Sequence, residues 1–183
     1  MAAPPTFHVS LLRGINVGGK HKVPMGWLRE AYAALGCEEV TTYLQSGNVV
    51  FRRDRAPTKV AAELAAVIER KLGFRIEVLD RTHDALATLL AHDPFPDADP
   101  SRRLVVFLSR SLTEPEVQSL TDIATERETL VIGTSELQLH CPDGIGRSKL
   151  ADAVSKKRLD LVATARNWRT VTALAELSAP VAE

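Results

Sequence analysis

The chain has 183 residues, of which 45% are hydrophobic and 25% are charged, and its formal net charge is zero. This composition is that of a globular protein and excludes the disordered and fibrous classes. Zero net charge argues against bulk attraction to nucleic acid or to an anionic membrane. No apolar run approaches the roughly 20 residues that cross a bilayer, and the N-terminal segment lacks the pattern of a secretory signal. We therefore expect a cytoplasmic protein with no membrane partner.

Hydrophobic periodicity and turn residues predict the elements of the first half. Pro24 and Pro57 suit the first turn of a helix, and Gly36 and Gly73 suit helix ends. Strands are expected at 7–13, 40–44, 49–53 and 74–79, and helices at 24–35, 57–72 and near 82–91. The order is βαββαβ followed by one helix.

The second half repeats this order after a segment rich in proline and aspartate, 93–102, which predicts an exposed linker. Thr113 and Glu116 have the spacing of a helix capping box. Strands are expected at 104–109, 129–132, 137–141 and 162–165, with helices after Thr113, from Ser148, and over 171–177. The domain boundaries that follow are 1–92, the linker 93–102, and 103–183.

The predicted fold is α+β, with two ferredoxin-like (βαββαβ) subdomains that each have an antiparallel sheet and helices on one face. A right-handed crossover makes the first two strands of each half parallel, and the third strand returns between them. In the first half, the loop 14–23 and the turn 46–48 must then lie at one end of the sheet. In the second half, the loop 142–148 and the turn 166–168 share one end for the same reason.

Cysteine and histidine usage gives no sign of a metal or cofactor site. Cys37 and Cys141 are lone thiols, which fit a reducing compartment better than a disulfide framework. His140 and Cys141 are neighbours on a predicted strand, so their side chains point to opposite faces and cannot share a metal. We expect neither a bound metal nor a cofactor.

The four loops concentrate positive charge beside glycines. They hold seven basic residues (Arg13, Lys20, Lys22, Arg147, Lys149, Arg166 and Arg169) and one acidic residue, Asp143. Glycine turns and helix N-termini expose N–H groups that suit phosphate or carboxylate. The candidate anion-binding residues are Arg13, Asn16, Gly18, Gly19, Lys20, Ser46, Asn48, Gly146, Arg147, Ser148, Lys149, Arg166 and Asn167. We expect a phosphate at residues 144–149 with Arg166, with the loop of Arg13 and Lys20 as a further contributor.

Structural roles for the same residues stay open. The turn 46–48 suits an ordinary hairpin, and Asn167 suits a helix cap. Gly14 to Lys20 matches the spacing of a phosphate-binding loop, but His21 stands where such a loop has Ser or Thr. These loops contain no pair of carboxylates and no Ser–His–Asp set, so catalytic residues stay unassigned. The alternatives to a small phosphate-bearing ligand are a nucleic-acid module, disfavoured by 5% aromatic content, and a protein-interaction role.

At these loops the sequence resembles a known family, the uncharacterised and mostly bacterial domain-of-unknown-function family 1697. The resembling stretches are LLRGINVGGKHKVPM (11–25), YLQSGNVVF (43–51), HCPDGIGRSKL (140–150) and TARNWRTV (164–171). His21 stands where family members often carry Asn. The resemblance implies a fold of two α–β plait subdomains, in agreement with the pattern, and implies no particular activity.

Overall fold

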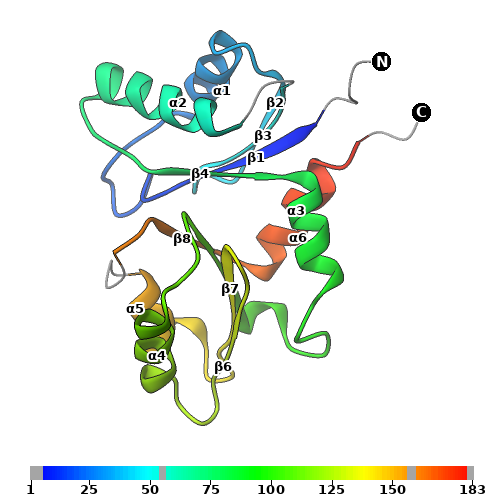
Figure 1. Cartoon of the computed structure of the whole chain (residues 1–183). Coiled ribbons are helices and arrows are strands. Elements are labelled where there is room, and N and C mark those ends of the chain that lie inside the picture. Colours follow the sequence, from blue (N-terminus) through cyan, green and yellow to red (C-terminus); the bar gives the residue numbers. More distant parts are fainter. Residues whose placement is uncertain (1–5, 54–56, 156–159, 181–183) are drawn as a thin grey trace. The chain divides into compact units, whose positions relative to one another are not determined.

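The structure is a computed structural model that describes residues 6–53, 57–155 and 160–180. The chain divides into two compact units. Unit 1 consists of residues 1–89 with 173–183, and unit 2 consists of residues 90–172. Figure 1 follows the chain through both, and each unit is described by itself.

Unit 1 is built on a sheet with strand order β2-β3-β1-β4 among its described residues. Every pair of neighbouring strands is antiparallel, so β3 lies between β1 and β2, which run parallel to each other. The predicted βαββαβ order and strand arrangement are confirmed. The elements are β1 (Phe7–Leu12), α1 (Met25–Ala34), β2 (Glu38–Tyr43), β3 (Asn48–Arg52), α2 (Pro57–Leu72), β4 (Val78–Thr82) and α3 (His83–Ala91).

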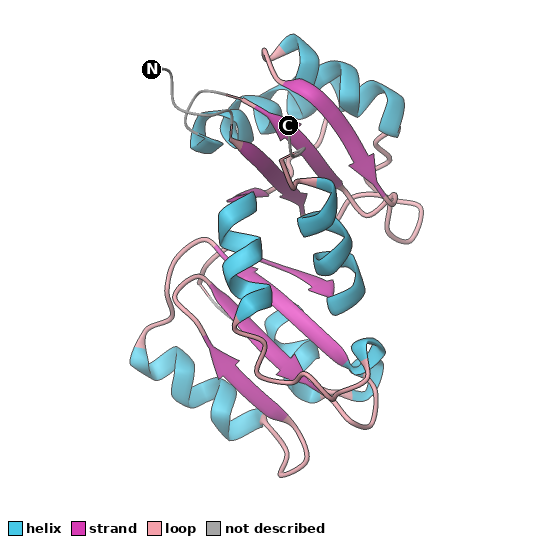
Figure 2. Cartoon of the chain, turned by 90° about the vertical axis from the view of Figure 1, so that its right-hand side faces the viewer, coloured by secondary structure: helices cyan, strands magenta, loops and turns pink. Residues whose placement is uncertain are grey.

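Unit 2 repeats this topology with strand order β6-β7-β5-β8 in the part of the chain that is described. The capping box predicted at Thr113 and Glu116 is present at the start of α4. Its elements are η1 (Pro100–Arg102), β5 (Arg103–Leu108), α4 (Glu114–Ile123), β6 (Thr129–Ile132), β7 (Glu136–His140), η2 (Ile145–Arg147), α5 (Lys149–Ser155) and β8 (Ala163–Asn167). The last helix, α6 (Trp168–Leu177), begins in unit 2, and its residues from Ala173 belong to unit 1. Two antiparallel sheets with helices, an α+β fold, agree with the fold class predicted from sequence (Figure 2).

In each unit two helices pack on one face of the sheet. In unit 1, Leu12 and Phe51 from the sheet meet Tyr32 of α1 and Leu64 of α2. The corresponding core of unit 2 joins alternate residues of β5 and β7 to α4 and α5. Alternation along a strand sends every second side chain to the helix-covered face. That periodicity explains why short strands suffice for each core.

Two predicted boundaries are wrong. The strand expected at 74–79 is β4, Val78–Thr82, because its register is set by pairing with β1 and extends over polar residues. Phe74 and Ile76 instead pack on the core of unit 1 outside any strand. The turn expected at 166–168 does not exist, since Arg166 and Asn167 belong to β8 and Trp168 starts α6.

The segment 93–102 is attached to β5 through Arg103. The Arg103 side chain is buried, forms an ion pair with Asp93, and lies 3.7 Å from the ring centroid of Trp168. It also lies 5.9 Å from the ring centroid of Phe95. A guanidinium held between aromatic faces and a carboxylate is well stabilised inside a protein. Asp93 and Phe95 are therefore fixed contacts of unit 2.

A carboxyl group is buried on the helix-covered face of unit 1. Asp80 of β4 lies opposite Ser10 of β1, whose hydroxyl donates a hydrogen bond to it. Within the described residues, the second carboxylate oxygen of Asp80 and the hydroxyl of the fully buried Tyr32 find no hydrogen-bond partner. Burial raises the pKa of Asp80 to about 6, and the bond from Ser10 opposes that rise. A charged Asp80 therefore destabilises the fold.

We predict that Asp80→Asn stabilises the protein above pH 6. Because the folded pKa is raised above the unfolded value, the carboxylate costs up to about 3 kcal/mol at neutral pH. This cost disappears as the pH falls from 6 to below 4. Urea unfolding at pH 7.5 and pH 4.5 should show a higher free energy of unfolding for the variant at pH 7.5 and a smaller difference at pH 4.5. An equal effect at both pH values would contradict a buried ionisable Asp80.

Candidate functional site

The two predicted loops of unit 1 meet at one end of its sheet, as the strand directions require. The N–H of Leu12 donates to the carbonyl of Gly47 over 2.8 Å. The side-chain nitrogen of Asn16 donates to the carbonyl of Gln45 over 2.9 Å. The loop after β1 and the turn after β2 are therefore in direct contact.

Asn16 and Asn48 are structural within these loops. Asn16 bonds Val23 from both sides of its amide, accepting from the backbone N–H at 2.9 Å and donating to the carbonyl at 3.1 Å. Asn48 is fully buried, and its amide nitrogen donates to the carbonyl of Tyr43 and the hydroxyl of Ser46. Both amides hold the loops in shape.

Gly18 and Gly19 form the tip of a tight turn. Both have positive φ, +57° and +76°, and the N–H of Lys20 donates to the carbonyl of Val17 over 3.1 Å. Consecutive positive φ values are those of a type I′ turn, which favours glycine at both positions. The turn places Lys20 on the exposed surface, while Arg13 is half-buried at the base of the loop.

A cavity of about 320 Å³ opens between the loop, the turn and the start of α1. Its lining residues are Asn16, Gly19, Lys22, Val23, Pro24 and Gln45, and none of them is acidic. Pro24 occupies the N-cap position of α1, no side chain caps it within the described residues, and the first turn has no acidic residue. The positive end of the helix dipole and the exposed Lys22 therefore face a cavity without a compensating carboxylate.

The loop 142–148 of unit 2 surrounds a second, smaller cavity of about 120 Å³. Ser148 caps α5, as its hydroxyl accepts a hydrogen bond from the N–H of Ala151 at 2.9 Å. The lining residues are Thr125, Glu128, Cys141, Asp143, Gly144, Arg147, Ser148 and Lys149. Gly146 lies in η2 and is not among them. Sequence reasoning missed Glu128, because it lies 14 residues before the first residue of the loop, Pro142. The Thr-x-x-Glu spacing from Thr125 was its one local signal.

Arg166 lies on the other face of the unit 2 sheet from this cavity. It pairs with Val105, whereas Leu104 and Leu139, on the alternate face, belong to the helix-covered core together with Cys141. Its guanidinium donates to the Thr164 hydroxyl and the Ala165 carbonyl, both at 2.8 Å. Burial lowers the pKa of Arg166 to about 10. Strand alternation therefore separates Arg166 from the loop that follows β7.

Burial limits the chemistry of Cys141 in the cavity of unit 2. Burial raises the pKa of Cys141, so its thiol stays protonated at neutral pH and is a weak nucleophile. Asn167 caps α6 by accepting a hydrogen bond from the N–H of Thr170 at 2.8 Å.

Across the described residues, no three His, Cys, Asp or Glu side chains come together as a metal site would require. No helix in that part of the chain is long and apolar enough to cross a membrane.

Comparison with protein families identifies the chain's relatives. Residues 6–137 match the model of a family described as "Protein of unknown function (DUF1697)". The chain belongs to this family. The family resemblance seen in the sequence is thus confirmed, and DUF1697 membership carries no assigned activity.

A solved structure shares the fold of this DUF1697 chain. It is described as "The structure of conserved bacterial protein SP0830 from Streptococcus pneumoniae". The TM-score is 0.80 at 23% sequence identity, over 96% of this chain and 99% of that one. No curated protein matches the chain at a significant level. At this identity the likeness shows the fold alone.

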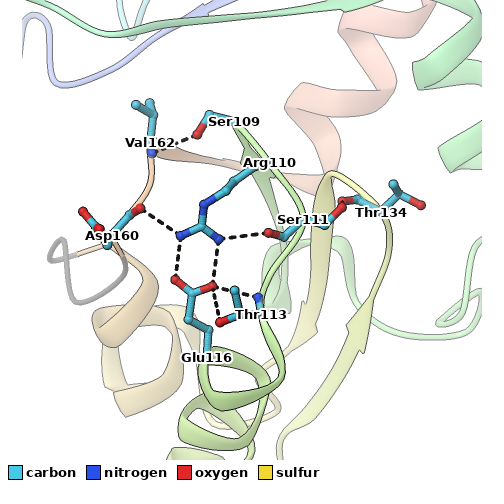
Figure 3. Close-up of polar contacts among 8 residues, drawn as sticks. All are labelled: Ser109, Arg110, Ser111, Thr113, Glu116, Thr134, Asp160 and Val162. Atoms are coloured by element: carbon cyan, nitrogen blue, oxygen red, sulfur yellow. Dashed lines mark hydrogen bonds and ion pairs between the residues drawn. The ribbon is translucent and has the colours of Figure 1, made fainter.

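At the end of the unit 2 sheet that corresponds to the cavity end of unit 1, polar side chains bond one another (Figure 3). Arg110 donates two hydrogen bonds to the carboxylate of Glu116, at 2.8 and 2.9 Å, and a third to the carbonyl of Asp160. Glu116 also accepts from the N–H of Thr113 at the start of α4. Ser111 bonds the carbonyl of Thr134 in the following turn. The N-terminus of α4 is therefore capped by a side chain of the same unit, that of Glu116.

We predict that Arg110→Ala raises the pKa of Glu116. Hydrogen bonds from Arg110, then from Thr113, lower that pKa to about 2. Without the guanidinium it should rise toward 4.5 and remain below it, because the bonds from Thr113 persist. NMR titration of the glutamate side chains measures the shift. Arg127→Ala, which removes the partner of Asp143, is the control and should leave Glu116 unchanged.

We predict that Gly47→Ala destabilises unit 1 by about 2–4 kcal/mol. Gly47 has φ +82°, and an added Cβ would lie 2.7 Å from Leu12 Cβ and 2.8 Å from Ile15 Cδ1. Gly146→Ala is the control, since its φ is ordinary and nothing described lies within 4 Å of the added atom. Urea denaturation should separate the two variants. Equal stabilities would show that the turn moves freely to accept a side chain.

Proposed function

We propose that the protein binds a small anionic ligand, such as a phosphate-bearing molecule, in the cavity of unit 1. The start of α1 supports this. Its first turn has no capping side chain and no acidic residue among those described, and Lys22 lines the adjoining cavity. Exposed N–H groups, the positive end of the helix dipole and a nearby ammonium group together favour an anion.

The equivalent helix of unit 2 is an internal comparison. α4 follows the first strand of its unit, as α1 does, and the two sheets share one strand order. At α4 the first turn holds Glu114 and Glu116, and the capping box is complete. The N-terminus of α4 in unit 2 is therefore capped by side chains of its own chain. The N-terminus of α1 in unit 1 has no such cap among the described residues, so its N–H groups are left for solvent or a ligand.

The loop of Gly146, Arg147, Ser148 and Lys149 supports a bare anion less well. Glu128 lines the same cavity and repels a bare anion, and Asp143 in that lining is paired with Arg127. Arg166 bonds within its own strand on the opposite face of the sheet. The anion proposal therefore rests on unit 1, with Lys20 and Lys22 as the cations closest to the glycine turn.

We also propose that the protein works in the cytoplasm. Cys37 and Cys141 are both free and buried. Free thiols in a chain without a disulfide between them fit a reducing compartment.

The test of anion binding uses isothermal titration calorimetry with inorganic phosphate. It compares the Gly26→Glu variant with the Gly26→Ala variant. Gly26 is exposed in the first turn of α1 and has room for a side chain. Both variants should melt above the parent, because glycine is unfavourable inside a helix by up to about 1 kcal/mol. Gly26→Ala should keep phosphate binding, whereas the negative charge of Gly26→Glu should weaken it at least about tenfold.

Lys22→Ala should also weaken phosphate binding, by about one to two orders of magnitude, and Lys149→Ala in unit 2 is the matched control. Equal losses for Lys22→Ala and Lys149→Ala would move the site away from unit 1. Absence of phosphate binding at millimolar concentration would refute the proposal. Salt-dependent binding of an oligonucleotide in its place would indicate a nucleic-acid module.

A further inference from the structure

The cavity of unit 2 brings together side chains of both charges from three separate segments. Glu128 comes from the turn before β6, and Cys141 follows β7. The third segment supplies the two cations: Arg147 ends η2 and Lys149 is the first residue of α5. Its volume of about 120 Å³ is close to the roughly 150 Å³ of a protein cavity that holds benzene. A molecule of only a few non-hydrogen atoms fits there.

The cations of this cavity have no ion-pair partner among the residues that the structure describes. Arg147 and Lys149 are exposed, and neither forms an ion pair or side-chain hydrogen bond with any described residue. Asp143, the acidic residue nearest in sequence, is paired with Arg127 at 2.8 Å. Two positive groups therefore remain to receive an anionic group.

Glu128 supplies negative charge in the same cavity. One of its carboxylate oxygens accepts hydrogen bonds from the N–H of Thr125 at 3.0 Å and from the Thr125 hydroxyl at 3.1 Å. Burial acts to raise the pKa of Glu128, but hydrogen bonds from Ser148 and Thr125 outweigh it and lower the pKa. Glu128 is thus ionised at neutral pH and held in a fixed orientation.

We propose that this cavity binds a small zwitterion, with its ammonium group at Glu128 and its carboxylate at Arg147 and Lys149. Besides Asp143, which is paired with Arg127, the lining carries one carboxylate, Glu128, and two cations, Arg147 and Lys149. A bare anion meets repulsion from Glu128, and a bare cation meets it from Arg147 and Lys149, whereas a zwitterion pairs with both sides. A free α-amino acid has this chemistry and this size. The proposal is independent of anion binding in unit 1.

The experiment titrates the full chain with glycine, acetate and methylammonium while NMR follows the backbone amides of Cys141, Gly144 and Ser148. Glycine should shift these signals saturably and bind at least about tenfold more tightly than acetate or methylammonium. Glu128→Gln keeps the shape of the side chain and should reduce glycine binding to the level of acetate. Lys71→Gln on α2 of unit 1 is the control, since Lys71 is exposed and lines neither cavity, and it should leave glycine binding unchanged.

Lys149→Gln is a second variant. Unlike Glu128→Gln, it does not disturb the hydrogen bonds between Thr125 and Glu128. Lys149 is exposed and no described residue bonds its side chain, so the variant should fold normally and bind glycine several-fold more weakly. Acetate binding as tightly as glycine would show an anion site and overturn the proposal. Absence of saturable glycine shifts, or full glycine binding by both Glu128→Gln and Lys149→Gln, would overturn it as well.

Discussion

The crossover from β1 through α1 to β2 leaves a space one strand wide, and β3 fills it by pairing antiparallel with both neighbours. A strand–helix–strand crossover joins two parallel strands, so β1 and β2 run in the same direction. The ends of β1 and β2 therefore meet at one edge of the sheet, with the start of α1 beside them. The loop and the turn that make the unit 1 cavity are together for this reason.

Close backbone contact at that edge then restricts the side chains. Gly47 approaches Leu12 and Ile15 so nearly that only a hydrogen atom fits on its Cα. Asn16 bridges the loop and the turn with its amide. Some of the polar residues predicted to contact a ligand, such as Asn16 and Asn48, thus form hydrogen bonds that shape the loops instead. What remains for a ligand is backbone N–H, the helix dipole and lysine.

The two units share one topology but differ in how the N-terminus of their first helix is capped. At the start of α4, Glu116 satisfies the helix and binds Arg110, so the charges cancel within the chain. At the start of α1 no such pair exists among the described residues. In unit 2 the exposed functional groups lie at the opposite end of the sheet, where Glu128 and the cations of the loop line one cavity. The two candidate sites thus differ chiefly in which charges line them. The unit 1 cavity has a lysine and no acidic residue, whereas the unit 2 cavity has residues of both charges.

Local sequence determined the features that depend on neighbours in the chain. The βαββαβ order, the helix ends at Gly36 and Gly73, the capping box at Thr113 and the cap at Ser148 follow from periodicity and short-range hydrogen bonds. Strand order followed as well, because chirality permits few alternatives.

Only the tertiary structure decided which face each charged side chain occupies and what it meets there. Arg166 sits in a strand, and alternation turns it away from Arg147, although both lie at one end of the sheet. Glu128 reaches the cavity through the pairing of β6 with β7, and Asp80 becomes buried because the β1–β4 register carries it under the helices. Each outcome depends on register, which long-range backbone pairing sets and which no short stretch of sequence encodes.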